Sequence, residues 1–192
     1  DKSGGIQVVA MTYYGTRQST SNKDFNDCAG MKGIKMRVPD VPAYLALPKA
    51  CGANPTPIAF AEVYLALQNG TVEAQENPLT TIEAKKFYEV QKNIILTAHI
   101  VDSLGTQVAP HVWSKLSDAD KKVFTDVMQE AAAGATADIK KREGELVDEF
   151  KKKGLNVHTV DKKNFQDAIM KTVPMESMGY SKADWDKIQA VK

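Results

Sequence analysis

The chain has 192 residues, and its 25 Lys and Arg against 24 Asp and Glu leave a formal net charge of +1. This balance provides no broad positive field, so neither nucleic acid nor an anionic membrane surface is expected as a partner. Hydrophobic residues make up 43% and charged residues 26%, which is typical of a globular domain. No apolar stretch reaches the roughly 18 residues of a membrane span, so the chain is not expected to be membrane-embedded.

The first part of the chain alternates strand-like and helix-like segments. The pattern predicts a strand at 6–14 ended by Gly15, an extended polar segment at 17–22, a helical turn at 25–31 and a strand at 34–38. A helix at 42–50, a turn at 54–57, a helix at 60–69, a short strand at 72–75 and a helix at 79–86 follow. The short strand is expected to break at Glu76-Asn77-Pro78.

The second part is dominated by one long helical pattern. Strand-like runs at 90–97 and 106–113 precede it, and a strand at 155–160 and helices at 161–173 and 181–191 follow it. The helix is predicted from Asp118 to about Lys153, with Ser117 as its N-cap. It would be roughly 54 Å long, which suggests a spine that serves more than one lobe. Alternating strands and helices predict an α/β fold.

The two cysteines, Cys28 and Cys51, allow two interpretations. They are either separate buried thiols or one disulfide, which would need an oxidising compartment. Cys28 lies just before a predicted strand, and Cys51 ends a predicted helix that runs back antiparallel to it. A bridge would close a loop of about 24 residues and contribute on the order of 3 kcal/mol.

Short catalytic motifs are missing from the sequence. The three histidines are not in HExxH, and GxSxG, GxGxxG and GxxxxGK[ST] do not occur. No metal site and no cofactor is therefore predicted, and binding is favoured over catalysis. An enzyme acting on a small organic acid is kept as the alternative, with His99 as its candidate base.

Three polar residues follow or end predicted strands: Arg17, Arg37 and Asn77. Ligands of open α/β sheets bind outside the carboxyl ends of strands, so these side chains could converge on one small anion. A guanidinium matches a carboxylate with two parallel hydrogen bonds, and Phe60 could supply an apolar wall. The competing interpretation is that both arginines are surface groups paired with neighbouring carboxylates.

Long stretches of the sequence resemble the substrate-binding proteins of tripartite ATP-independent periplasmic (TRAP) transporters, the DctP-type family. The matching segments are TRQSTSN (16–22), GMKGIKMRVP (30–39), GANPTPIAFAEVYLALQNGTVEAQENPL (52–79), KKFYEVQK (85–92) and LTAHI (96–100). They cover nearly all of residues 16–100 in the order and at the spacing of the family.

The resemblance implies roles for individual residues. Arg37 looks like the arginine that clamps the ligand carboxylate, and Arg17 like the second pocket arginine of the sugar-acid and sialic-acid branch. Asn77 resembles an asparagine that also touches the carboxylate, and Phe60 an aromatic residue packed on the ligand. His99 and Asp102 stand where that branch has polar residues near the pocket.

The resemblance also implies a two-lobed fold like that of periplasmic binding proteins, with a long helix spanning both lobes. Residues 15–102 and 143–192 would form the second lobe, and residues 1–14 and 103–142 a remnant of an incomplete first lobe. The expected function is capture of a carboxylate ligand in the periplasm and delivery to TRAP membrane subunits. Because the segments after Arg37 and His99 differ from the sialic-acid branch, a hexuronate or related sugar acid is expected at least as much as sialic acid.

Overall fold

The computed structural model describes residues 4–179 and 181–191, and a mixed six-stranded sheet is its centre. The strands lie in the order β3-β2-β4-β1-β5-β6. Their bounds are β1 Gln7–Ser21, β2 Lys35–Val38, β3 Asn54–Pro57, β4 Ala74–Pro78, β5 Asn93–Val108 and β6 Asn156–Thr159. β1 runs antiparallel to both β4 and β5, whereas β2 is parallel to β3 and β4, and β6 is parallel to β5.

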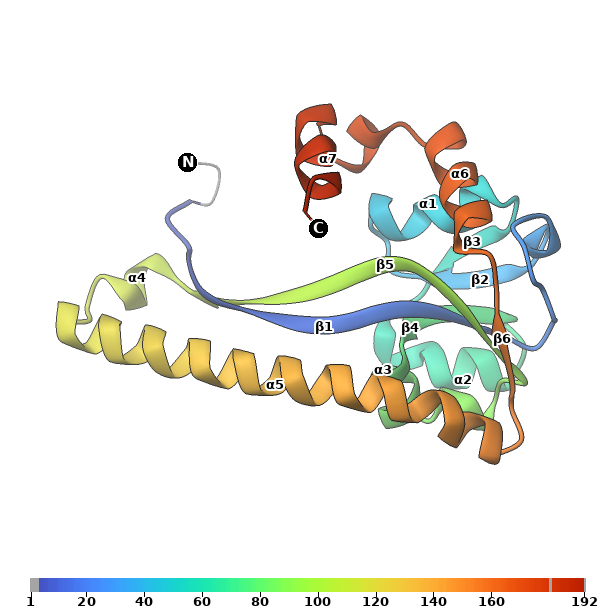
Figure 1. The fold of residues 1–192 in the computed structure, drawn as a ribbon, viewed down its shortest axis with the longest axis horizontal. Coiled ribbons are helices and arrows are strands. Elements are labelled where there is room, and N and C mark those ends of the chain that lie inside the picture. Colours follow the sequence, from blue (N-terminus) through green and yellow to red (C-terminus); the bar gives the residue numbers. More distant parts are fainter. Residues whose placement is uncertain (1–3, 180, 192) are drawn as a thin grey trace.

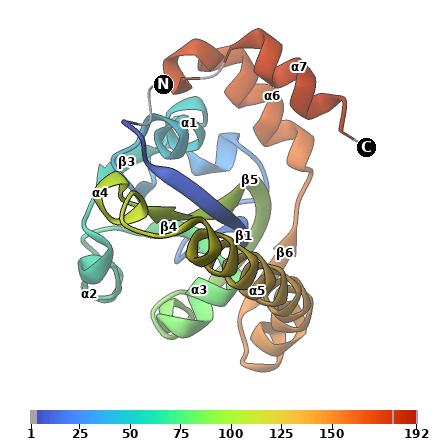
Figure 2. The ribbon, with the colours of Figure 1, turned by 90° about the vertical axis from the view of Figure 1, so that its left-hand side faces the viewer.

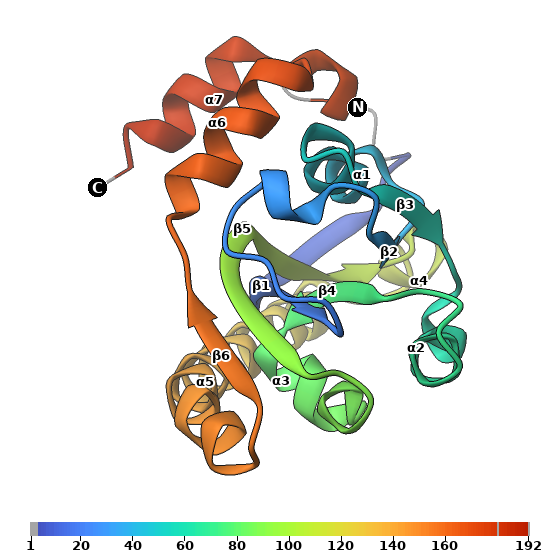
Figure 3. The same ribbon diagram turned by 90° about the vertical axis from the view of Figure 1, so that its right-hand side faces the viewer.

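Helices cover both faces of this sheet (Figure 3). The helices are α1 Pro42–Ala50, α2 Val63–Gln68, α3 Leu79–Ala84, α4 Pro110–Trp113, α5 Asp118–Lys152, α6 Lys162–Thr172 and α7 Lys182–Gln189, with 3-10 turns η1 Ala29–Met31, η2 Phe60–Glu62, η3 Phe87–Glu89 and η4 Met175–Met178. Successive residues of a strand point to opposite faces. Ile95 accordingly packs in the core shared with α1 and α6, and Ile94 in the core shared with α2, α3 and α5. The α/β prediction is confirmed.

Helix α5 runs for 35 residues along the sheet, and the prediction of a single long helix is confirmed. The side chain of Ser117 accepts a hydrogen bond from the backbone N–H of Asp120, which is the predicted N-cap. Leu146 and Phe150 are buried under the sheet, while the first half of the helix lies along β1 and β5, with α4 beside its start (Figures 1 and 2). Within the described ranges, no helix has the length and apolarity needed to cross a membrane.

Several predicted boundaries are wrong, and β1, β4 and β5 are longer than expected. Gly15 does not end β1: its φ of +139° coincides with a register shift against β5, so it forms a bulge within the strand. β4 continues through Pro78 because β2 pairs only with its first two residues, so the missing N–H of the proline is not needed there. Residues 54–57 form an edge strand, and 110–113 form α4, not a strand.

The cysteines form a disulfide between Cys28 and Cys51, with their Cα atoms 4.7 Å apart. This is the second of the two interpretations that the sequence left open. The bond ties η1 to the end of α1 across a sequence separation of 23 residues. Both cysteines are part of the core that also contains Met31 and Phe165. The bond thus fixes the loop that precedes β2, the strand that carries Arg37.

Candidate functional site

Arg17 lies inside β1, only 4% exposed, and is held by protein carboxylates. Its Nε and Nη2 donate to the two carboxylate oxygens of Glu76, and Nη1 donates to Oδ2 of Asp102 at 3.0 Å. Nη2 also donates to Oδ1 of Asn77 at 3.1 Å. Burial opposes the charge of the guanidinium, but the hydrogen bonds and charge of Glu76 outweigh it and raise the pKa of Arg17. Of the five N–H groups of an arginine, one on Nη1 remains without a described partner.

His99 contacts the same carboxylate from β5. Its Nε2 lies 3.2 Å from Oε2 of Glu76, and its Nδ1 lies 2.8 Å from the hydroxyl of Thr97. A bulge places the ring there: Ala98 has a φ of +45°, and its N–H donates to Oε1 of Gln18 at 2.8 Å. Glu76 is thus the centre of the cluster, although no local sequence pattern distinguishes it from other carboxylates.

Tyr44 from α1 closes the other side of this cluster. Its hydroxyl donates to Oδ2 of Asp102 at 2.8 Å, and the Cζ of Arg17 lies 4.7 Å from the centre of its ring. Burial, followed by the hydrogen bond to Asp102, raises the pKa of Tyr44 to about 12. Tyr44 was not predicted as a site residue. Its position two residues after Pro42, in the first turn of a helix that follows a site strand, is the signal that was available.

Arg37 is as buried as Arg17, at 4% exposure, but its environment is different. Its Nε and Nη2 both donate to the backbone carbonyl of Ile58, at 2.9 and 2.8 Å. No carboxylate within the described part of the chain forms a salt bridge with it, and three of its N–H groups have no partner there. Burial lowers the pKa of Arg37; the negative charge of Glu76 partly offsets this, and the positive charge of Arg17 adds to it.

A small recess opens at Arg37, at the carboxyl ends of β2 and β3. Its volume is about 330 Å³, and it is lined by Arg37, Pro39, Asp40, Pro57, Ile58 and Ala59. Phe60 stands beside it: the Cζ of Arg37 lies 5.9 Å from the ring centre of Phe60, which packs edge-on against the buried Phe87 at 6.2 Å. Phe60 is 41% exposed, and Nζ of Lys85 also lies 5.5 Å from the centre of its ring.

The structure therefore brings the predicted residues into two adjoining groups. Arg17, Asn77, His99 and Asp102 surround Glu76, whereas Arg37 and Phe60 lie together at the recess. The two groups adjoin because Arg37 lies opposite Gln75 in the pairing of β2 with β4. The interpretation of both arginines as surface groups is wrong, since both are buried, although Arg17 does pair with carboxylates.

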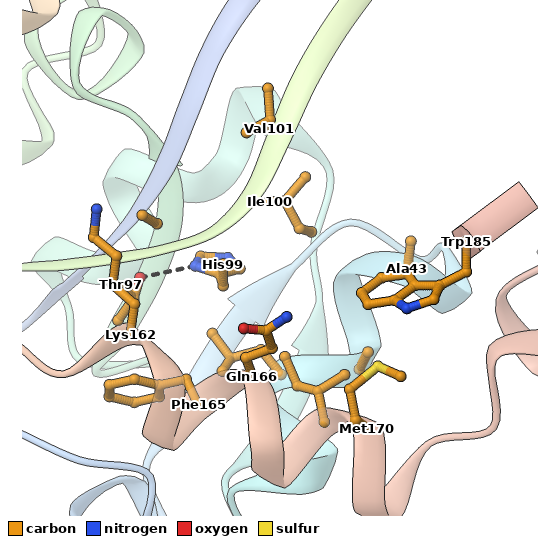
Figure 4. Close-up of a pocket in the computed structure, with 14 residues that line it drawn as sticks. Ala43, Thr97, His99, Ile100, Val101, Lys162, Phe165, Gln166, Met170 and Trp185 are labelled. Carbon is orange, nitrogen blue, oxygen red and sulfur yellow. Dashed lines mark hydrogen bonds between the residues drawn. The ribbon is translucent and has the colours of Figure 1, made fainter. Parts of the chain in front are cut away.

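A second cavity, of about 500 Å³, lies between α1, the bulge of β5, α6 and α7 (Figure 4). Of the predicted site residues only His99 lines it, beside apolar side chains that include Phe165 and Trp185. Among the described residues of this lining, Lys162 is the only Lys or Arg, so the cavity is poorly suited to a strongly anionic ligand. In the part of the chain that is described, no group of three His, Cys, Asp or Glu side chains could hold a metal ion.

Comparison with known proteins identifies the family of this chain. Residues 1–177 match the family model described as bacterial extracellular solute-binding protein, family 7 (DctP). The sialic acid-binding periplasmic protein SiaP of Vibrio cholerae is 45% identical over 157 residues, which are 82% of this chain and 49% of that protein. The chain thus spans about half the length of this curated relative.

Solved structures match almost the whole chain. A TRAP periplasmic solute binding protein from Roseobacter denitrificans, with bound 3-deoxy-D-manno-oct-2-ulosonic acid, superposes with a TM-score of 0.92 at 31% identity, covering 98% of this chain and 64% of that one. Another from the same organism, with bound β-D-glucuronate, has a TM-score of 0.88 at 28% identity, with shares of 98% and 64%. By the family match over residues 1–177, this chain belongs to bacterial extracellular solute-binding protein family 7.

Proposed function

We propose that this chain is the part of a TRAP transporter's periplasmic solute-binding protein that holds the carboxylate of a sugar acid. The single observation that carries the proposal is Arg37, a buried guanidinium that no carboxylate of the described residues neutralises. An unpaired buried charge is costly, and such groups cluster at functional sites. A ligand carboxylate would supply the missing negative charge.

The donors around Arg37 suit a carboxylate. Its three unpartnered N–H groups include both of Nη1, and the guanidinium is planar, which matches the two oxygens of the ligand. The remaining N–H of Arg17 and the side-chain amide of Asn77 would add further donors. Phe60 would pack against the carbon skeleton of the ligand. His99 and Asp102 would act indirectly, through Glu76 and Arg17.

The ligand class follows from the relatives. Of the three relatives described above, one is named for sialic acid, and the other two have an octulosonic acid and a hexuronate bound. All three molecules are sugar acids with one carboxylate. We propose a ligand of this class, with hexuronates and sialic acid as the first candidates. No group in the proposed binding role needs to act as a base or nucleophile, so the proposal assigns no catalysis.

The proposed lobes have support in the distribution of apolar surface. Exposed apolar side chains gather on the distal halves of β1, β5 and α5, including Val8, Met11, Leu104, Val123 and Val127. These residues lie within the ranges 1–14 and 103–142, which we propose belong to a first lobe. Exposed apolar side chains that gather in one part of a fold favour a covering partner. Closure of two lobes would remove the ligand from water and strengthen its pairing with Arg37.

We propose the membrane partner and the cellular compartment of the protein from its family and its disulfide. TRAP membrane subunits would receive the ligand, and the periplasm would be the location of the protein. The disulfide between Cys28 and Cys51 supports an oxidising compartment.

Native mass spectrometry of the protein with N-acetylneuraminate, D-glucuronate and D-gluconate tests the proposal. One of these acids should bind, and it should be recovered chemically unchanged after long incubation. Glucose and N-acetylmannosamine, which have no carboxylate, should not bind and serve as controls. Conversion of a sugar acid into product, or equal binding of the neutral sugars, would contradict the proposal.

A further inference from the structure

A series of buried side-chain hydrogen bonds, called the amide network below, begins at Arg17 and continues away from the proposed site. Nη2 of Arg17 donates to Oδ1 of Asn77 at 3.1 Å, and Nδ2 of Asn77 donates to Oε1 of Gln75 at 2.6 Å. Nε2 of Gln75 donates to the hydroxyl of Thr20 at 3.0 Å, which donates to Oε1 of Gln91 at 2.9 Å. All five side chains belong to residues that are at most 5% exposed.

The groups at both ends of the amide network require its hydrogen bonds to be donated in the same direction, from Arg17 toward Gln91. Arg17 can only donate, and it meets the oxygen of Asn77. At the far end, Nε2 of Gln91 donates to the backbone carbonyl of Val90 at 3.1 Å, and a carbonyl can only accept. Turning any one amide by 180° would place two donors or two acceptors against each other, which is costly in a buried site. The amides are therefore oriented as a set.

This direction determines what Asn77 can offer. Its Oδ1 faces the guanidinium of Arg17 and accepts from it, and Nδ2 uses one N–H on Gln75, so its second N–H is a donor without a partner among the described residues. We propose that Gln75, Thr20 and Gln91 are positioning residues that hold the amide of Asn77 as a donor, so that the site favours a carboxylate over a ligand that carries its own N–H donors. The proposal rests on the proposed function only for the identity of what Asn77 meets.

Thr20 is the best position at which to interrupt the amide network. Thr20→Val keeps the shape of the side chain but removes the hydroxyl, whereas Thr20→Ser keeps the hydroxyl and loses the methyl group. Thr81→Val is a matched control, because Thr81 is also buried and its hydroxyl lies 2.8 Å from that of Tyr14, which is not part of the amide network. A role in packing alone predicts that valine is tolerated and serine is not, and the proposed role predicts the reverse.

The first measurement needs no ligand. In NMR spectra of the full chain, Thr20→Val should shift the side-chain amide signals of Asn77 and increase their exchange with solvent by about three- to tenfold, as expected when one buried hydrogen bond is lost. Thr20→Ser and Thr81→Val should leave them close to wild type. Unchanged Asn77 signals in Thr20→Val, or an equal change in Thr20→Ser, would overturn the proposal.

The second measurement concerns selectivity. The affinity for D-glucuronate divided by that for D-glucuronamide should fall about three- to tenfold in Thr20→Val and stay unchanged in Thr20→Ser. An unchanged ratio in Thr20→Val, with glucuronate still bound, would overturn the selectivity part of the proposal. If wild type binds no sugar acid, the proposed function fails. The Asn77 signals alone then still decide whether the amide network orients the side chain of Asn77.

Discussion

At the scale of single residues, the two arginines of the site show how partners decide the role of a buried charge. Arg17 and Arg37 are equally buried, yet Arg17 is surrounded by Glu76 and Asp102, whereas the hydrogen bonds of Arg37 within the described residues go to the carbonyl of Ile58. Truncating one member of a buried ion pair leaves the other charge unpaired. Removing a charge that has no partner relieves a cost instead.

The two arginines should therefore respond oppositely to the same substitution. Arg17→Met should lower the free energy of unfolding by about 3–5 kcal/mol, because Glu76 stays buried without its counter-charge. Arg37→Met should leave that free energy unchanged or raise it. Urea unfolding followed by circular dichroism measures both variants. Equal losses of stability would mean that Arg37 is neutralised within the folded chain and that its proposed role is wrong.

Tyr44 predicts a dependence of stability on alkaline pH. An unfolded tyrosine loses its proton near pH 10, while the pKa of folded Tyr44 is about 12. Between these values the unfolded state binds fewer protons than the folded state, so stability falls as pH rises through this window. Since Tyr44 is only partly buried, we expect a loss of about 1–2 kcal/mol.

The comparison of wild type with Tyr44→Phe isolates this effect, because other alkaline titrations are common to both proteins. The difference between their free energies of unfolding should be constant below about pH 10 and change between about pH 10 and 12. Parallel curves across the whole range would show that Tyr44 ionises equally in both states.

At the scale of elements, the bulge of β1 is the joint between the sheet and helix α5. Oε1 of Glu143 accepts the backbone N–H of Thr16 at 2.8 Å, and its Oε2 accepts the hydroxyl of Tyr13 at 2.7 Å. Gly15 lies between them, where a Cβ atom would be 2.6 Å from Cβ of Pro78 and 2.7 Å from Oε1 of Glu143. The next residue but one is Arg17, so this joint also sets the position of the carboxylate cluster.

Gly15→Ala should consequently destabilise the fold by about 2 kcal/mol or more, through strain at positive φ and the clash with Pro78. Gly134→Ala is the matched control: this glycine lies within α5, and an added Cβ would meet nothing within 4 Å. It should stabilise by about 0.5–1 kcal/mol through helix propensity. Thermal unfolding distinguishes the two, and a tolerated Gly15→Ala would show that the joint can rearrange.

The elements predicted well from the sequence were those with local signals. Helix α1 begins at Pro42, and helix α5 begins after its Ser117 cap, both as predicted. The strands were underestimated because their continuation depends on non-local pairing: β1 and β5 support each other far past Gly15 and past the predicted end of β5. A glycine reads as a break in a sequence, but in a paired strand it forms a bulge.

The candidate site was predictable in its residue types but not in its connections. The six residues singled out from the sequence do lie in the two adjoining groups around Glu76 and the recess. Glu76 itself was interpreted only as part of a strand break, since a carboxylate has no local mark that distinguishes a buried ion pair from a solvated surface. Only the pairing of β1 with β4 places it beside Arg17.

At the scale of the whole molecule, the sheet has a compact part with an apolar core on each face and a longer part that extends beyond these cores. β1, β5 and α5 continue together beyond the other strands (Figure 1), and their far ends carry exposed apolar side chains. The relatives have additional length that this chain does not match. The recess at Arg37 lies at the carboxyl end of β2, where ligands of α/β sheets are expected.

The most direct test of the account is the affinity of Arg37→Met for the sugar acid that wild type binds, measured by calorimetry on a variant whose unfolding curve matches wild type. Affinity should fall at least about tenfold, because the ligand carboxylate loses its only unpaired guanidinium. Unchanged affinity in a folded Arg37→Met protein would contradict the account at its centre.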